Sequence, residues 1–87
     1  MEEKIAFESR EHFNEDFYVW IYDGSDGVTI ESEYCEGIFE CIDDAITQLG
    51  DKLMDENIRY FEEGKPAPFL QKFIQDTIRH RAESKKS

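Results

Sequence analysis

The run FYVWIY at residues 17–22 constrains the fold most, because all six residues are aromatic or β-branched. Such residues favour strands. Residues 23–27, DGSDG, are typical of a turn, since their two glycines accept positive φ. Residues 28–34 then alternate: Val28, Ile30 and Tyr34 share one face, and the polar residues between them share the other. We therefore predict a β-hairpin over residues 17–34.

Helical periodicity follows the hairpin. Residues 35–37 connect to a stripe of apolar residues that runs from Ile38 to Leu53 at helical spacing. At Gly50 the pattern changes, and Met54, Ile58 and Phe61 form a second stripe. Either the helix breaks at Gly50, or one long helix contacts the sheet with its first half and another element with its second. We favour a single helix over residues 38–63, with any kink at Gly50.

The two ends of the chain complete the predicted order of elements. Residues 64–68, GKPAP, end the first helix, and Pro68 suits the first turn of a second helix over residues 68–82. The apolar stripe of this second helix consists of Phe69, Leu70, Phe73, Ile74 and Ile78. Residues 83–87 form a polar tail. Within residues 1–16, Ile5 and Phe7 indicate an edge strand, and residues 9–12 form one helical turn or a loop. The prediction is one α+β domain over residues 1–87, (β)ββαα, with a small antiparallel sheet and helices on one face.

Composition excludes several classes of protein. The chain has 87 residues, a net charge of −11 and 14% aromatic residues. The aromatic content is too high for a disordered chain, and the charge argues against direct binding to nucleic acid. No apolar run is long enough to span a membrane, and MEEK at the start lacks the apolar region of a secretory signal. We expect a cytoplasmic protein of a bacterial host cell, with Cys35 and Cys41 reduced and half-buried.

No motif predicts catalysis. The turn at Asp23 and Asp26 fails the ligand spacing of a calcium loop, and His12 and His80 are not spaced for a catalytic pair with either cysteine. The chain also lacks a glycine-rich phosphate loop. We therefore expect no enzyme activity, no cofactor and no metal.

The charge is unevenly distributed along the chain. Residues 1–64 carry 19 acidic and 4 basic side chains, and residues 65–87 carry 2 acidic and 6 basic ones. On a continuous helix, five carboxylates would fall within about 60° of one another and form an acidic ridge roughly 33 Å long. These five are Glu40, Asp44, Asp51, Asp55 and Glu62. Either this ridge mimics the phosphates of nucleic acid, or it is an ordinary solvated helix face.

The hairpin adds further candidates for partner contact. Asp26 lies at its tip, and Glu31 and Glu33 lie on its polar face. Trp20 belongs to a strand that is apolar on both faces. Either both faces are covered, one by the helices and the other by the N-terminal segment or a second copy, or one face is exposed as an aromatic interface. We include Trp20 among the predicted partner-binding residues.

The hairpin with its Asp-Gly turn and the acidic residues after it resemble small acidic phage-encoded inhibitors, the DNA-mimicking anti-CRISPR and anti-restriction proteins. The order of hairpin and helix also resembles the partial ribonuclease-H-like fold of HicB-type antitoxins, although the Pro-Gly-Cys segment usual there is absent. Bacteriocin immunity proteins share the size and acidity. These resemblances imply a contact with another protein rather than a reaction.

These observations lead to two hypotheses. The first is a protein that binds and inhibits a basic nucleic-acid-binding partner, such as a nuclease or an effector complex, in conflict between phage and host. An antitoxin or an immunity protein is an alternative within this class. The second is a homodimeric assembly module joined through the aromatic strand or the last helix.

Overall fold

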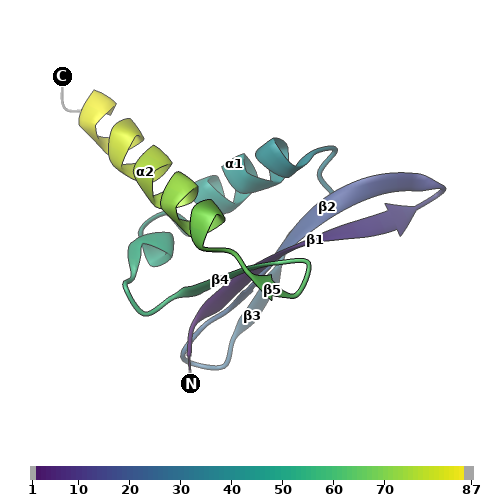
Figure 1. The fold of residues 1–87 in the computed structure, drawn as a ribbon, viewed down its shortest axis with the longest axis horizontal. Helices are drawn as coiled ribbons and strands as arrows, with labels where there is room; N and C mark the ends of the chain where they lie inside the picture. Colours follow the sequence, from purple (N-terminus) through teal and green to yellow (C-terminus); the bar gives the residue numbers. More distant parts are fainter. Residues whose placement is uncertain (1, 86–87) are drawn as a thin grey trace.

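The aromatic run forms β2 (Glu15–Asp23), which is paired on both sides in the computed structural model of residues 2–85 (Figure 1). It is antiparallel to β1 (Lys4–His12) and to β3 (Thr29–Glu31). On the far side of β1 lie β4 (Arg59–Glu62) and β5 (Lys65–Pro66). The strand order β3-β2-β1-β4-β5 gives a mixed sheet, because β1 and β4 are parallel.

The helices α1 (Ile38–Leu49) and α2 (Pro68–Lys85) lie on one face of this sheet, and the 3₁₀ helix η1 (Gly50–Met54) follows α1 (Figure 1). The predicted α+β class, with N-terminal strands before the helices, is confirmed. The sheet is larger than expected, since β4 and β5 form between the two helices. No helix among the described residues is both long and apolar enough to cross a bilayer.

The N-terminal strand is central, not at the edge as predicted. β1 pairs with β2 along its whole length, so residues 9–12 are strand rather than a helical turn or a loop. Its apolar residues, Ile5 and Phe7, face the helices and are buried. Lys4, Glu8 and Arg10 face the opposite side of the sheet, where Arg10 pairs with Glu8 at 2.6 Å. Charges suit a central strand here because the helices cover only one face.

The long helix predicted over residues 38–63 is wrong. α1 ends at Leu49, and Gly50 takes a φ of 51°, which favours glycine and stops the helix. After η1, the chain returns to the sheet as β4, in which Tyr60 is buried on the helix side between exposed Arg59 and half-buried Phe61. The first of the two alternatives, a break at Gly50, is therefore correct.

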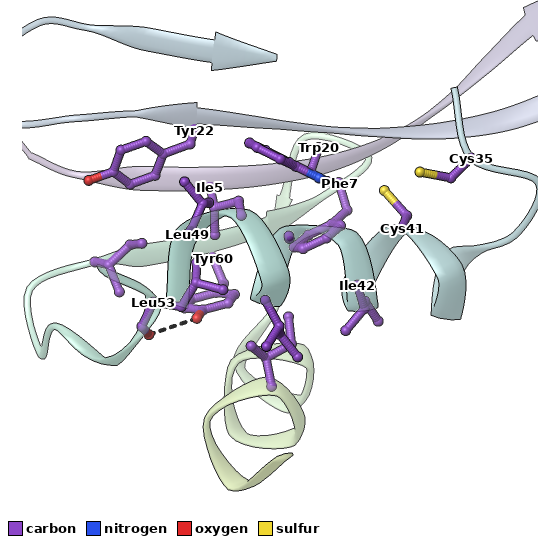
Figure 2. Packing of buried hydrophobic residues seen from close by; sticks show 14 residues of the cluster. Ile5, Phe7, Trp20, Tyr22, Cys35, Cys41, Ile42, Leu49, Leu53 and Tyr60 are labelled. Atoms are coloured by element: carbon purple, nitrogen blue, oxygen red, sulfur yellow. Dashed lines mark hydrogen bonds between the residues drawn. The ribbon is translucent and has the colours of Figure 1, made fainter. Parts of the chain in front are cut away.

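The core lies between the helices and the sheet. The predicted stripe of α1 is confirmed, because Ile42, Ala45, Ile46 and Leu49 are buried against the sheet. Figure 2 shows Trp20, Phe7 and Ile5 pointing from the strands toward α1. Cys35 and Cys41 are free thiols that lie beside each other, and both are buried rather than half-buried (Figure 2). Burial raises the pKa of both thiols.

The stripe predicted on the second helix divides in two. Ile74 is fully buried, and Leu70 and Ile78 pack against the core. Phe69 and Phe73 instead stay exposed, and the ring of Phe73 contacts exposed Phe39 of α1 edge-on at 6.1 Å. The helix begins at Pro68 as predicted and extends to Lys85, so the predicted tail is shorter. Lys86 and Ser87 lie outside the described residues.

Candidate functional site

The predicted acidic ridge does not exist as a helix face, because its residues lie on different elements. Only Glu40 and Asp44 belong to α1. Asp51 lies in η1, Asp55 follows it, and Glu62 lies in β4. The ridge fails because it depends on one continuous helix, which ends at Gly50.

Trp20 and Asp44 are structural residues rather than exposed partner contacts. The Trp20 side chain is only 1% exposed, so the aromatic interface predicted at this position is wrong. Its indole Nε1–H donates a hydrogen bond of 2.8 Å to Oδ2 of Asp44. This bond joins β2 to α1 and gives the buried indole the acceptor that it needs. Asp44 therefore belongs to the packing of the core, although its carboxylate is partly exposed.

Five of the predicted carboxylates gather around the outer strand of the sheet. We call Val28–Tyr34 the β3 edge, because β3 ends the sheet and this segment continues it on both sides. Around it lie the edge carboxylates, which are Asp26, Glu31, Glu33, Asp51 and Asp55. Glu40 lies just beyond, where its carboxylate accepts the amide N–H of Glu36. Glu62 lies on the other side of the sheet.

A depression of about 330 Å³ lies on the helix side of the β3 edge. The turn after β2 contributes Asp26, and η1 and the residue that follows it contribute Asp51 and Asp55. Two of these carboxylates are held locally: Asp26 accepts the amide N–H of Val28 at 3.0 Å, and Asp55 accepts that of Asn57 at 2.8 Å. Asp and Asn favour such turns because their short side chains reach the backbone two residues on.

Tyr22 lies at the floor of this depression beside Glu3. Its hydroxyl donates a hydrogen bond of 2.8 Å to a carboxylate oxygen of Glu3. The ammonium of Lys52 lies 5.6 Å from the centre of the Tyr22 ring. Burial, then the bond to Glu3, and then the charges of Asp26 and Asp55 raise the pKa of Tyr22 to about 12. The depression is therefore unfavourable for a further negative charge.

This shifted pKa predicts a loss of stability in alkali. The folded protein binds the Tyr22 proton more tightly than the unfolded chain, whose tyrosine has its ordinary pKa of 10.0. The stabilisation that the protonated Tyr22 hydroxyl gives the folded protein is complete below pH 10 and is lost as the pH rises toward 12. We expect a Tyr22→Phe variant to lose less stability over this interval, as measured by urea unfolding. Burial also raises the pKa of Tyr60, so part of the stability loss in alkali remains in this variant. Parallel pH profiles for the variant and the wild type would contradict this assignment.

A second depression lies on the opposite side of the same edge, over the open face of the sheet. It is lined by Val19, Glu31, Ser32, Glu33 and Tyr34. The predicted alternation ends early here, because Tyr34 does not share a face with Ile30. The Tyr34 ring instead stacks on the His12 ring, with 4.7 Å between the ring centroids, and lies 5.6 Å from the centroid of the Phe17 ring. The alternation of faces ends at Ser32, because its hydroxyl accepts the Trp20 amide N–H and interrupts the hydrogen-bond ladder between this segment and β2.

Two exposed aromatic groups were not among the predicted site residues. Phe13, in the tight turn between β1 and β2, is 86% exposed and lies 4.2 Å from His12. Both turn residues, Phe13 and Asn14, have positive φ, as a two-residue hairpin loop requires. The pair of Phe39 and Phe73 joins the outer surfaces of the two helices. The pattern that marked α2 as amphipathic included Phe73, so only the packing reveals its exposure.

The edge carboxylates are not neutralised by ion pairs among the described side chains, although Lys52 lines the same depression as Asp26, Asp51 and Asp55. Five ion pairs join described side chains, and none of the five includes an edge carboxylate. Arg10, which is hydrogen-bonded to Glu8, is also influenced by the charge of Glu31, which helps to raise the pKa of its guanidinium. Within the described part of the chain, no group of three or more histidines, cysteines or acids is placed to hold a metal ion.

Taken together, the fold and this surface define a small α+β protein whose outer strand is acidic and open. Comparisons with protein-family models, with curated proteins and with solved structures find no match.

Proposed function

We propose that this chain binds a basic protein that itself binds nucleic acid, and that it inhibits this partner by occupying its nucleic-acid site. The setting that we propose is conflict between phage and host, as for anti-CRISPR and anti-restriction proteins. The observation that supports this most is the gathering of the edge carboxylates around one open edge of the sheet, where none of them is in an ion pair with a described side chain.

The negative charge of such a surface speeds its association with a basic partner and selects that partner over acidic ones. A surface with uncompensated carboxylates attracts lysine and arginine over roughly a Debye length, about 8–10 Å at physiological salt. A groove that binds phosphates presents those side chains in a row. Backbone amides already hold the carboxylates of Asp26 and Asp55, so these two side chains lose little conformational entropy when the cations arrive. The same surface repels nucleic acid, which fits an inhibitor of a nucleic-acid-binding protein.

Apolar side chains beside the carboxylates would supply the buried part of the contact. Val28, Ile30 and Tyr34 are 53%, 37% and 51% exposed. Charge alone gives fast but weak association, whereas desolvated apolar and aromatic anchors give long residence times. The β3 edge offers both within one short segment. An antitoxin or immunity protein would use the same contact against a toxin, so the identity of the partner separates these alternatives.

The test is affinity capture from a bacterial lysate, washed with increasing salt and analysed by mass spectrometry. The bait is the whole chain, and the matched bait carries Asp26→Asn, Glu31→Gln, Glu33→Gln, Asp51→Asn and Asp55→Asn. We expect the native bait alone to retain a nucleic-acid-binding protein, which salt then releases. Equal recovery with both baits would contradict a role for the edge carboxylates.

A second candidate function, assembly through self-association, is favoured by the aromatic patch on the helices. Phe69 is 88% exposed and lies one helical turn before Phe73, which is 46% exposed and contacts the ring of Phe39, which is 72% exposed. Contiguous exposed aromatic residues are typical of interfaces between proteins. Sedimentation equilibrium tests this candidate: a dimer that Phe69→Glu dissociates would support it, and a monomer at all concentrations would exclude it.

A further inference from the structure

The two outer edges of the sheet are built differently. β5 consists of Lys65 and Pro66 only, and both a lysine and a proline discourage pairing with another strand. The β3 edge is longer and contains no lysine, arginine or proline over residues 28–34. Of these two outermost strands, the β3 edge is therefore better suited to accept a further strand.

The backbone of the β3 edge is prepared for such a strand. The carbonyl of Val28 accepts the Gly24 amide, and the Ser32 amide donates to the Trp20 carbonyl. Tyr22 and Ile30 face each other between these two bonds. Because inward and outward hydrogen bonds alternate along an antiparallel strand, the N–H and C=O groups of Thr29 and Glu31 point away from β2. They form a row of donors and acceptors at the rim of the sheet.

The side chains of the edge specify what can pair there. Ile30 lies on the helix side with Val28, next to Asp51 and Asp55. Glu31 lies on the open side with Glu33. A second copy of this chain would bring glutamates against glutamates, and like charges in facing positions destabilise a sheet. A strand with alternating basic and apolar side chains would instead pair its cations with Glu31 and cover Val28 and Ile30.

We propose that the β3 edge binds its partner by accepting a basic β-strand, which extends the sheet beyond β3. This inference rests on the proposed function, because it takes the partner to be a basic protein. It adds a specific contact: backbone hydrogen bonds to Thr29 and Glu31 supply affinity, and the glutamates select arginine or lysine on the incoming strand.

The test uses a peptide as long as the β3 edge in which arginine and valine alternate, with blocked ends. Its matched control is the same peptide N-methylated on alternate amides, which keeps every side chain and charge but removes the donors along one edge. Because either register is possible, both alternating patterns are prepared. We expect one of the two N-methylated peptides to bind at least about tenfold more weakly than the parent peptide in isothermal titration, because it loses the backbone hydrogen bonds to the β3 edge. Equal affinity for all three peptides would overturn the inference.

A protein variant provides the second arm. Thr29→Pro removes an amide that points away from β2, so the β2–β3 pairing is kept while the incoming strand is blocked. Thr29→Val is the matched control, because both variants lose the hydroxyl that bonds Asp23 but only proline loses the N–H. We expect Thr29→Pro to bind the peptide about tenfold less tightly than Thr29→Val. Equal binding by the two folded variants would contradict strand addition.

Hydrogen exchange measured by NMR observes the contact directly in the wild-type protein. The peptide is expected to slow exchange at the amides of Thr29 and Glu31 and to leave that of Ser32, already bonded to Trp20, nearly unchanged. Unprotected Thr29 and Glu31 amides in the bound state would refute the pairing. If the N-methylated peptides bind as well as the parent, and the charge-neutralised bait still fails to capture a partner, strand addition is wrong and the proposed function stands.

Discussion

A Trp20→Ala variant is expected to lose about 3–5 kcal/mol of unfolding free energy, the usual cost of removing a large buried aromatic side chain. Trp20 is 1% exposed and packs with Phe7 and Tyr22 in the core cluster. Whole proteins are stable by roughly 0.05–0.15 kcal/mol per residue, so a chain of 87 residues has a total of about 4–13 kcal/mol and this loss is a large fraction of it. Urea unfolding followed by circular dichroism measures it, and we expect a variant that is largely unfolded near 37 °C.

The hydrogen bond between Trp20 and Asp44 can be tested separately with substitutions at Asp44. Asp44→Asn keeps an oxygen that accepts the indole N–H, whereas Asp44→Leu leaves this buried donor without a partner. We expect Asp44→Leu to lose about 1–3 kcal/mol and Asp44→Asn clearly less. If Trp20→Ala unfolds within about 0.5 kcal/mol of the wild type, the range of ordinary surface substitutions, then Trp20 does not organise the core.

Neutralising the five edge carboxylates is expected to slow association with the captured partner by about 10- to 1000-fold at low salt, the range of electrostatic steering. Surface plasmon resonance over a series of salt concentrations measures this rate. The dependence on salt should flatten as well, because fewer charges are left to screen. Stability should not fall, since the edge carboxylates make no ion pair among the described residues.

A second variant with the same net charge shows whether position matters. It neutralises exposed acids away from the β3 edge, which are Glu11, Glu15, Asp16, Glu62 and Glu83. We expect this variant to associate much faster than the variant that lacks the edge carboxylates. Equal slowing in the two variants would mean that total charge, rather than the β3 edge, determines binding.

Local patterns in the sequence were sufficient to predict the elements that have a continuous run or a regular spacing of apolar residues. The aromatic run became β2, the stripe from Ile38 to Leu49 became α1, and Pro68 began α2. The central position of β1 could not be predicted in this way. Its apolar residues, Ile5 and Phe7, are few because one face of the sheet is open, and its pairing with β4 joins residues more than 50 positions apart.

The error at residues 50–63 has a specific physical cause. Ile58 and Phe61 suit a helical stripe, whereas Ile58 and Tyr60 suit a short buried strand, and four residues are too few to separate the two periods. Gly50 was the decisive signal, since its positive φ stops the helix. Tertiary pairing with β1 then fixes the strand.

The predicted site is only partly retained, and for a different reason. Asp51 and Asp55 were predicted from helical spacing, yet they meet Asp26 because η1 places them against the turn after β2. The role of Asp44 depends on its contact with Trp20, which lies 24 positions away and leaves no local pattern. Residue types therefore predicted the chemistry of the surface, and only the fold determined its location.

Competition with nucleic acid tests the central claim most directly. The captured partner is bound to a fluorescent duplex oligonucleotide at about 0.15 M salt, and this chain is added while fluorescence anisotropy is followed. We predict full displacement of the duplex by the wild-type chain and little displacement by the variant that lacks the edge carboxylates. A stable complex that holds the partner, the duplex and this chain together would contradict inhibition by nucleic-acid mimicry.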